Sequence, residues 1–483
     1  EGASLVRKTV AHRAGALAPP GVNSEAAMAQ LGLALAGQGG ETVAALGAAA
    51  AAHPDCGWCW EAWAEERLKG GDRAAALEIV QCSRRAQGVD EIARARLELL
   101  ESGLSGDHAM RAGAIGKLVR LTPSNTEVLS ELALRATSEK RWGEATAAWK
   151  HILAIDPGAL DAMNQLGYVE AWQSRFDEAV KWHKAYEAAG PELANAGDSM
   201  GEVLMMAGRF GEAERAFASS FEKSPDFNGG AAMEKAALAC WLRGDEAGAR
   251  QRLELFLKDR ASRGDLLVEW RRARWLYITG KAAEARQLLQ SVSVQGSPPA
   301  RAFALASLAL WSVEAGDRTS AIRHLGDLSA MRHPVATRIL PVVAPILKPG
   351  PRPGADGLSE GIRAQLSGDD IRAIPALKAA LRTAPPGGEW LARELLAWAY
   401  VRTGDLAAAA GQVRAGWPMP ATLEGQLTDF LVYPNLLYVR ARVATYNGDS
   451  AGAAKLFEAY VKFVGSRPDA RHQKDEVLKA VRL

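Results

Sequence analysis

Small and apolar residues recur at a fixed interval in the middle of this chain. Ala145, Ala179 and Ala213 each lie 34 residues after the one before, and each follows an aromatic residue by three positions. A second series has the same interval and consists of Pro123, Pro157, Pro191 and Pro225. A period of this length is typical of a supersecondary unit that is stacked many times. The pattern predicts an all-α protein built from repeated pairs of helices.

Each recurring residue has a physical role in such a pair. Small residues late in the first helix (Ala133, Gly167 and Gly201) and the alanines early in the second lie where two helix backbones approach closely. A larger side chain would push the two helices apart. The prolines end the second helix, because a proline ring cannot continue a helix interior.

Turn residues extend the pattern in both directions from these repeats. Glycine followed by aspartate or lysine can join two helices and cap the second one. The expected turns are Gly39-Gly40, Gly71-Asp72, Gly106-Asp107, Gly244-Asp245, Gly280-Lys281, Gly316-Asp317, Gly368-Asp369, Gly404-Asp405 and Gly448-Asp449. Together they predict about twelve helical pairs, the outermost being degenerate because one side faces solvent.

The chain resembles tetratricopeptide repeat proteins, whose 34-residue pattern is W-x-x-L-G-x-x-Y, then A-x-x-x-F, then P. The residues that match are Leu132-Ala133, Ala145, Trp149 and Pro157; Leu166-Gly167, Ala179 and Pro191; and Met200-Gly201, Ala213, Phe217 and Pro225. This resemblance implies a right-handed α-solenoid whose concave face is lined by the first helix of each pair. It also implies a binding function toward other proteins.

A proline-rich segment at residues 334–357 interrupts the array. Because proline removes a backbone donor and clashes with the preceding turn, we expect no regular helix there. We interpret it as a joint between an N-terminal array at 24–333 and a C-terminal array at 358–465. Residues 1–23 and 466–483 are expected to be extensions.

The composition is that of a folded, water-soluble protein without a strong charge preference. Hydrophobic residues make up 48% and charged residues 24%, and the formal net charge is only +2. This balance does not favour a nucleic-acid partner. No apolar run is long enough for a membrane-spanning helix.

The sequence offers little for catalysis. Cys56 and Cys59 form a C-x-x-C motif with three interpretations: small buried residues at the start of a helix, a local disulfide, or a redox or metal role. Cys82 and Cys240 are expected to be buried. His183 occupies a second-helix position where the family usually has an aromatic residue. We therefore predict a non-enzyme with no cofactor and no metal site.

The resemblance places a set of residues on the concave face. The predicted partner-binding residues are Asn164, Tyr168, Trp172, Asn195, Asp198, Glu202, Met205, Met206, Trp241, Trp270, Arg274 and Tyr277. An aromatic and methionine-rich surface suits an apolar or amphipathic protein segment. The alternative is that these side chains pack between repeats. Within Trp270–Trp275, alternating rings and arginines could bind nucleic acid or glycan, or the arginines could follow a solvated helix face.

Three functions fit these features. The first is a protein-interaction scaffold that organises a multi-protein complex. The second is a bacterial periplasmic scaffold for polysaccharide export, with exposed Trp residues stacking on sugars. The third is a regulatory module of a larger protein. The missing initial Met favours an exported, processed protein over a cytoplasmic one.

Overall fold

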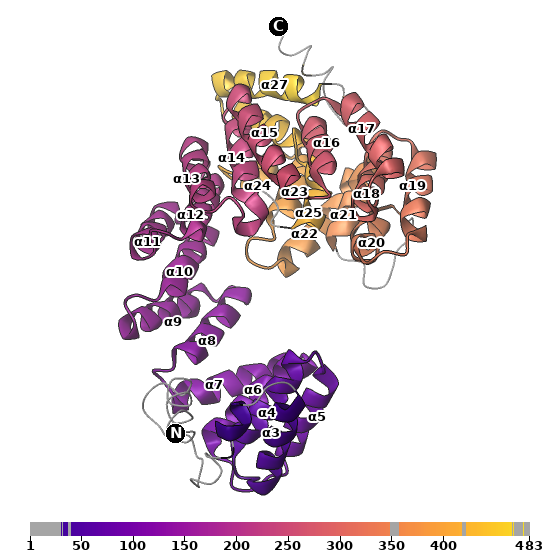
Figure 1. Cartoon of the computed structure of the whole chain (residues 1–483). Helices are drawn as coiled ribbons and strands as arrows, with labels where there is room; N and C mark the ends of the chain where they lie inside the picture. Colours follow the sequence, from indigo (N-terminus) through magenta and orange to yellow (C-terminus); the bar gives the residue numbers. More distant parts are fainter. Residues whose placement is uncertain are drawn as a thin grey trace. The chain divides into compact units, whose positions relative to one another are not determined.

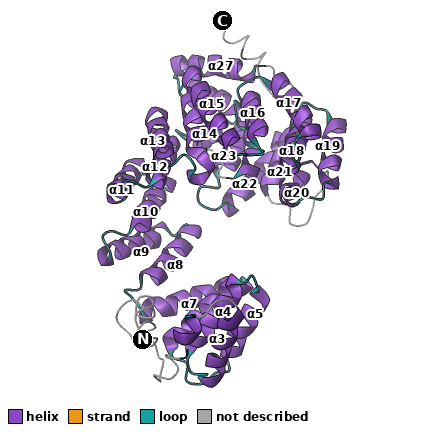
Figure 2. Cartoon of the chain, viewed as in Figure 1, coloured by secondary structure: helices purple, strands orange, loops and turns teal. Residues whose placement is uncertain are grey.

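A computed structural model describes residues 30, 32–36, 40–347, 357–417, 422–465, 467 and 477. Every regular element in these ranges is helical (Figure 2). The chain divides into two compact units, residues 1–169 (unit 1) and 170–483 (unit 2). The boundary falls within α10 (Leu160–Trp172).

The described helices of unit 1 before α10 are α3 (Gly40–Ala52), α4 (Gly57–Lys69), α5 (Arg73–Ser83), α6 (Glu91–Ser105), α7 (His108–Leu121), α8 (Thr126–Ser138) and α9 (Trp142–Ile155) (Figure 1). Those of unit 2 after α10 are α11 (Phe176–Ala189), α12 (Ala194–Met206), α13 (Phe210–Lys223), η1 (Phe227–Gly230), α14 (Ala231–Leu242), α15 (Glu246–Ser262), α16 (Val268–Ile278), α17 (Ala282–Gln295), α18 (Pro298–Glu314), α19 (Arg318–Ala330), α20 (Pro334–Leu347), α21 (Gly357–Leu366), α22 (Asp370–Thr383), α23 (Trp390–Thr403), α24 (Leu406–Gln412), α25 (Leu423–Gln426), η2 (Asp429–Leu431), α26 (Asn435–Tyr446) and α27 (Ser450–Val464).

The helices follow the 34-residue period of the sequence. First helices begin at Thr126, Leu160 and Ala194, each 34 residues after the one before. Second helices begin at Trp142, Phe176 and Phe210 with the same spacing. We call the first helix of a pair its A helix and the second its B helix. The predicted repeat of helical pairs is confirmed.

The short turns between paired helices adopt the left-handed backbone that glycine favours. Gly106, Gly208, Gly244, Gly280, Gly316, Gly368, Gly404 and Gly448 all have φ between 73° and 91°. In several turns the next aspartate caps the B helix. Asp245 Oδ1, for example, accepts the backbone N–H of Gly248 at 2.8 Å. All of these turns except that at Gly208 were among those predicted from glycine pairs in the sequence.

Small residues lie where paired helices touch. Ala145, Ala179 and Ala213 are completely buried. A methyl group added at Gly201 would lie 2.4 Å from the ring of Phe217, so a larger residue would force the two helices apart. The predicted role of these positions as close contacts is therefore confirmed.

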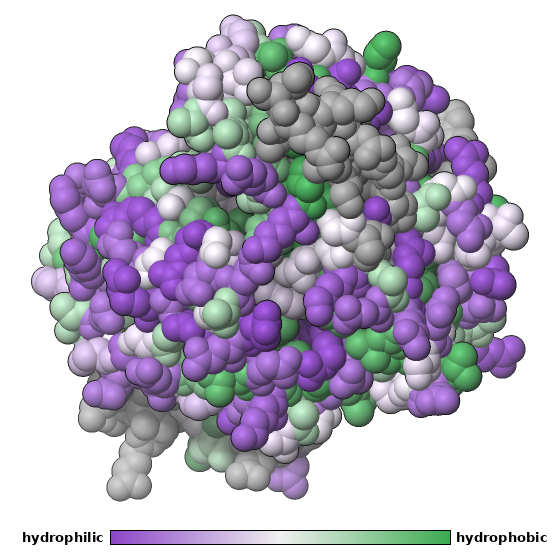
Figure 3. Space-filling model, turned by 90° about the horizontal axis from the view of Figure 1, so that it is seen from above, coloured by the Kyte–Doolittle hydropathy of each residue, from purple (hydrophilic) through white to green (hydrophobic). Residues whose placement is uncertain are grey.

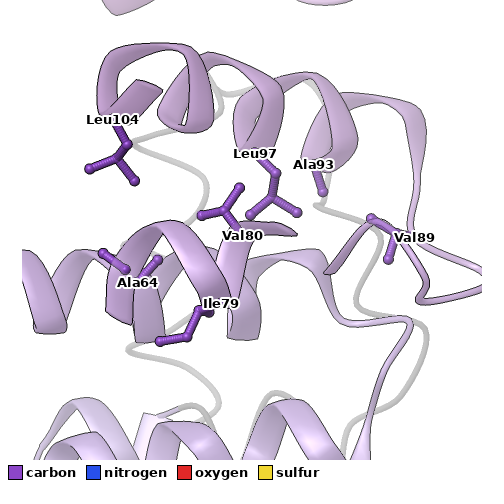
Figure 4. Close-up of a cluster of buried hydrophobic side chains, with 8 residues drawn as sticks. Ala64, Ile79, Val80, Val89, Ala93, Leu97 and Leu104 are labelled. Carbon is purple, nitrogen blue, oxygen red and sulfur yellow. The ribbon is translucent and has the colours of Figure 1, made fainter. Parts of the chain in front are cut away.

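The core lies between neighbouring pairs. Figure 4 shows one cluster of unit 1, in which side chains from α4, α5 and α6 meet. Its buried members are Ala64, Ile79, Val80, Val89, Ala93, Leu97, Ala76 and Leu104. Since one pair alone cannot cover these apolar faces, stacking of pairs stabilises the fold.

The prolines after the B helices act as predicted. Each of these B helices ends at a residue that directly precedes a proline: α7 at Thr122, α9 at Asp156, α11 at Gly190 and α13 at Ser224. Their φ angles lie between −128° and −151°, outside the helical region. Proline disfavours helical backbone in the preceding residue, which explains where these helices stop.

The proline-rich segment is more regular than expected. Residues Pro334–Leu347 form α20, with Pro341 and Pro345 inside it. The expectation that no regular helix forms there was wrong for this part. A buried stripe of Ala336, Ile339, Val343 and Ile346 packs against the rest of unit 2, and its burial outweighs the lost backbone hydrogen bonds.

Other predicted segments lie outside the described residues. These are the extension at 1–23, residues 348–356 of the expected joint, and all but residues 467 and 477 of the tail. The division into arrays at residues 334–357 stays a prediction. The face drawn in Figure 3 is mostly polar, with apolar side chains scattered on it. Among the described residues, no helix combines the length and hydropathy needed to span a membrane.

Candidate partner-binding sites

The predicted concave-face residues all lie on A helices, namely α10, α12, α14 and α16. Their exposure differs from the prediction. The half-buried residues are Asn164, Tyr168, Trp172, Asn195 and Glu202. The buried residues are Asp198, Met205, Met206, Trp241, Trp270, Arg274 and Tyr277. Most of this set is therefore covered by the protein itself.

A later part of the same chain covers the A helices of unit 2. The backbone N–H of Trp417 donates to the carbonyl of Met205 at 3.2 Å. A methyl group added at Gly416 would lie 1.7 Å from that carbonyl oxygen, so only glycine fits there. The ring of Tyr433 meets Trp241 edge-on, with centroids 5.6 Å apart. Figure 1 shows these C-terminal elements (orange) beside α14 and α16.

Buried charges hold this cover in place. Arg274 on α16 donates to Glu234 on α14 at 2.7 Å and to Asp429 of η2 at 2.8 Å. All three side chains are almost fully buried. Because burial is costly for an isolated charge, the guanidinium and its two carboxylates stabilise one another only together. Arg274 thus connects two A helices with a segment 155 residues further along.

A second buried cation, Arg467, binds the neighbouring residues of the cover. Arg467 donates to Glu314 at the end of α18 at 2.6 Å, and to the carbonyl of Phe430 at 2.8 Å. The hydroxyl of Tyr277 also donates to Glu314. Burial, and then the nearby Glu314 carboxylate, raise the pKa of Tyr277, so the phenol stays a donor. We call residues 413–417, 422–433 and 467 the covering segment.

The polar positions on α12 have internal partners. Lys235 on α14 lies 2.8 Å from Asp198 and also contacts Glu202. Burial opposes the charge of Lys235, while the carboxylates of Glu202 and Asp198 raise its pKa. These groups neutralise one another inside unit 2 instead of facing a partner.

The aromatic and methionine side chains of α12, α14 and α16 are therefore not an open face: they are buried within unit 2, as in the alternative that they pack inside the fold, and a role in partner binding stays a prediction. The arginines within Trp270–Trp275 are not a solvated stripe either. Arg271 pairs with Glu234 at 3.2 Å and Arg272 with Glu254 at 2.8 Å, while Arg274 is buried as described. Sequence reasoning missed the cause, because no local pattern marks the covering segment as the cover of helices far upstream.

The A helices of unit 1 line an open groove instead. A cavity of about 700 Å³ lies along α4, α6 and α8. Half-buried Leu68, Leu99 and Leu100 supply apolar surface. Ser130 of α8 also contributes to its lining. We call this cavity the unit 1 groove. The concave-face positions were predicted only for α10 to α16. Applying the same positions to the A helices nearer the N-terminus would have indicated the unit 1 groove from the sequence.

The lining of the unit 1 groove has a small excess of acidic over basic side chains. Its four glutamates are Glu61, Glu65, Glu127 and Glu131, and its three arginines are Arg73, Arg96 and Arg111. Each arginine has an internal partner. Arg96 binds Glu61 with two nitrogens, at 2.7 and 2.9 Å; Arg111 pairs with Glu131; and Arg73 donates to the carbonyl of Leu104 at 2.7 Å. The exposed carboxylate of Glu127 remains at the rim.

No family model matches the sequence, and no curated protein matches it. Several solved structures match much of this chain, at low identity and with low TM-scores. A tetratricopeptide repeat protein from Parabacteroides merdae is 11% identical, with 74% of this chain and 99% of that chain covered and a TM-score of 0.24. Human IFIT1 is 12% identical, with 96% and 94% covered and a TM-score of 0.35. Yeast Tom70 is 12% identical, with 89% and 91% covered and a TM-score of 0.29.

The spacing of the chain's own helices decides the fold. Three consecutive A helices and three consecutive B helices begin at 34-residue intervals, with small residues at the helix contacts and left-handed turns between the paired helices. The chain has a tetratricopeptide-like fold.

The cysteines of this tetratricopeptide-like chain differ among themselves. Cys56 precedes α4 and is joined to Cys59 by a disulfide, the second of the three interpretations. Cys240 is buried, whereas Cys82 is exposed, so the expectation for Cys82 was wrong. Among the described residues, no group of three or more His, Cys, Asp or Glu side chains could hold a metal ion.

His183 lies in the core of the tetratricopeptide-like repeat at α11. Its side chain is completely buried, as expected for a position where the family usually has an aromatic residue. Burial lowers the pKa of His183 to about 4, and the opposing effect of Glu202 is smaller. The imidazole is therefore neutral at pH 7 and serves as a core side chain.

Proposed function

We propose that this chain is a non-enzymatic scaffold that binds a segment of a partner protein in the unit 1 groove. One observation carries the proposal: the A helices of unit 1 line an open cavity of about 700 Å³, whereas those of unit 2 are covered by the chain itself. Concave, largely apolar cavities with a few polar groups are the usual form of binding sites.

The lining of the groove suggests what the partner presents. Leu68, Leu99 and Leu100 offer surface to apolar side chains. The excess of glutamates over arginines, with Glu127 exposed at the rim, suits basic side chains. The partner is thus a segment that combines apolar residues with lysine or arginine, such as an amphipathic helix.

Protein binding is favoured over glycan binding by the position of the tryptophans. A sugar-binding surface needs exposed rings on which sugars can stack. Of the fourteen tryptophans, eight are buried, among them Trp241, Trp270 and Trp417, and the other six are half-buried, so none presents a fully exposed ring. Organisation of a multi-protein complex is the broader role that such a scaffold would serve.

Selection from a displayed random-peptide library tests the proposal. The full chain is expected to enrich peptides rich in apolar and basic residues. Ser130 faces the groove from α8, and Ser130→Arg places a bulky cation inside it. This variant should weaken binding of the enriched peptides by about tenfold or more, through steric block and charge repulsion.

Ser138→Arg is the matched control, since it adds the same side chain at an exposed position of the same helix. It should leave the affinity unchanged. Circular dichroism of both variants checks that the fold is intact. The proposal fails if no peptide family is enriched, or if the enriched peptides bind Ser130→Arg as tightly as the unaltered chain.

A further inference from the structure

A second cavity lies in unit 2, away from the covering segment. It has a volume of about 680 Å³ and is formed by the end of α17, the start of α18, and α19 with the residues that follow it. Its charged and titratable lining residues are Arg301, Arg323, Arg332, His324, His333 and Asp327. We call it the basic cavity.

The arginines of the basic cavity differ from those in the covered part of unit 2. Among the described residues, none of Arg301, Arg323 and Arg332 forms an ion pair, and all three side chains are exposed. Arg301 donates only to the carbonyl of Ser293 at 3.2 Å, and Arg323 to the hydroxyl of Ser320 at 3.4 Å. A guanidinium has five N–H donors, so most of their hydrogen-bonding capacity is directed to solvent.

Asp327 is the single carboxylate of the lining, which leaves an excess of positive charge. His324 adds less to this excess. Burial, and then the charge of Arg323, lower the pKa of His324. The Nδ1 atom of His333 accepts the backbone N–H of Val335 at 3.2 Å, which leaves its Nε2 as a donor. The cavity therefore presents guanidinium and imidazole donors to an anion.

The remaining lining residues restrict the kind of anion. Val294, with 74% of its surface exposed, lies beside Leu305, Ala330 and Met331. The cavity lining contains no Trp, Tyr or Phe, so nucleic-acid bases lack a ring on which to stack. Aliphatic and thioether groups suit the side chains of a polypeptide. Guanidinium forks match carboxylates in a bidentate geometry.

We propose that the basic cavity binds an acidic segment of a polypeptide, in which carboxylates alternate with aliphatic side chains. The carboxylates would pair with Arg323 and Arg332, and the aliphatic groups would contact Val294 and Met331. This site is independent of the unit 1 groove, because it takes a ligand of the opposite charge.

Fluorescence anisotropy with two labelled peptides tests the site. One peptide alternates Asp and Leu, and the other replaces each Asp by Asn, which removes the charge but keeps the shape. The full chain should bind the Asp peptide and not the Asn peptide. The double variant Arg323→Ala, Arg332→Ala should weaken this binding about tenfold or more, since it removes two charge-assisted hydrogen-bonding partners.

The double variant Lys258→Ala, Arg382→Ala is the matched control. It removes two exposed positive charges elsewhere in unit 2, and it should leave the affinity unchanged. Equal loss in this control would overturn the proposal, because binding would then follow net charge alone. Equal binding of the Asn peptide, or no binding of the Asp peptide, would also overturn it. So would tighter binding of an oligothymidylate that the Arg323→Ala, Arg332→Ala variant abolishes.

Discussion

At the scale of single residues, the turns show how much of this fold is encoded locally. Lys140 and Ser174 have φ angles of 57° and 62°, in turns where other pairs have glycine. A glycine followed by aspartate marks such a turn without reference to distant parts of the chain, which is why the sequence alone predicted Gly244, Gly316 and Gly404 correctly. Lys140 and Ser174 were placed by the period and not by their residue type.

Ser174→Gly is expected to stabilise unit 2 by about 0.5–1 kcal/mol. Left-handed backbone destabilises the folded state of a non-glycine residue by roughly 1–2 kcal/mol, and substitution by glycine removes this cost. Glycine also has greater freedom in the unfolded chain, which offsets about 0.5–1 kcal/mol of the stabilisation. Urea unfolding monitored by circular dichroism would measure the change. Gly244→Ala provides the reverse test, with an expected loss of about 1 kcal/mol. A Ser174→Gly protein that is less stable than the unaltered chain would contradict the left-handed backbone at Ser174.

His183 should make the stability of unit 2 depend on pH. In the unfolded chain its pKa is 6.5, whereas in the fold burial lowers it to about 4. Above pH 6.5 the imidazole is neutral in both states and the native stability is complete. Between pH 6.5 and 4 only the unfolded chain binds the proton, so about 3 kcal/mol of stability is lost.

The variant His183→Phe removes the imidazole that binds this proton and places a phenyl ring in the core. Its melting temperature should fall less than that of the unaltered chain when the pH is lowered from 7 to 5. If the melting temperatures of the two proteins fell by the same amount over this pH range, His183 would not couple folding to pH.

At the scale of elements, the structure departs most from what the sequence could predict. The helical pairs follow from short-range spacing, but the covering of α14 and α16 depends on Asp429, which is 155 residues beyond Arg274. Neither residue carries a signal for the other, since a buried ion pair between distant segments leaves no periodic pattern. The residues assigned to the concave face therefore lie on A helices, as predicted. That a distant segment of the chain covers most of them was not predicted.

Asp429→Asn is expected to destabilise unit 2 by about 3–5 kcal/mol, because it leaves Arg274 buried with less compensating charge. The double variant Arg274→Met, Asp429→Leu should cost less than this single change, since it removes both charges, keeps apolar volume and leaves Glu234 paired with Arg271 at 3.2 Å. Chemical denaturation of the two proteins would compare them. A double variant that is less stable than Asp429→Asn would show that the pair contributes more than its burial costs.

At the scale of the whole molecule, the two units treat their A helices differently. Unit 1 leaves a groove along α4, α6 and α8, whereas unit 2 fills the corresponding face with the covering segment. The difference places the proposed peptide site in unit 1 and the proposed acidic-segment site on the surface of unit 2. Both proposals rest on which surfaces the fold leaves open.

A chain shortened to end at Gln412 tests this difference. It lacks the covering segment together with α26 and α27, so Met205, Trp241 and Tyr277 lose their contacts with Trp417, Tyr433 and Phe430. Hydrogen exchange should show loss of protection in α12, α14 and α16, while α4 to α9 keep theirs, because the contacts of those helices lie within unit 1. Unchanged protection in α14 and α16 would show that the covering segment is not needed to stabilise them.

The distance along the chain between Arg274 and Asp429, and between Glu314 and Arg467, has a consequence for biosynthesis. As the polypeptide leaves the ribosome, unit 1 can fold pair by pair from neighbouring contacts. The methionines and aromatic rings of α12, α14 and α16 emerge long before the covering segment that will enclose them. We expect this interval to be the period in which the nascent protein is most prone to aggregation and most dependent on chaperones.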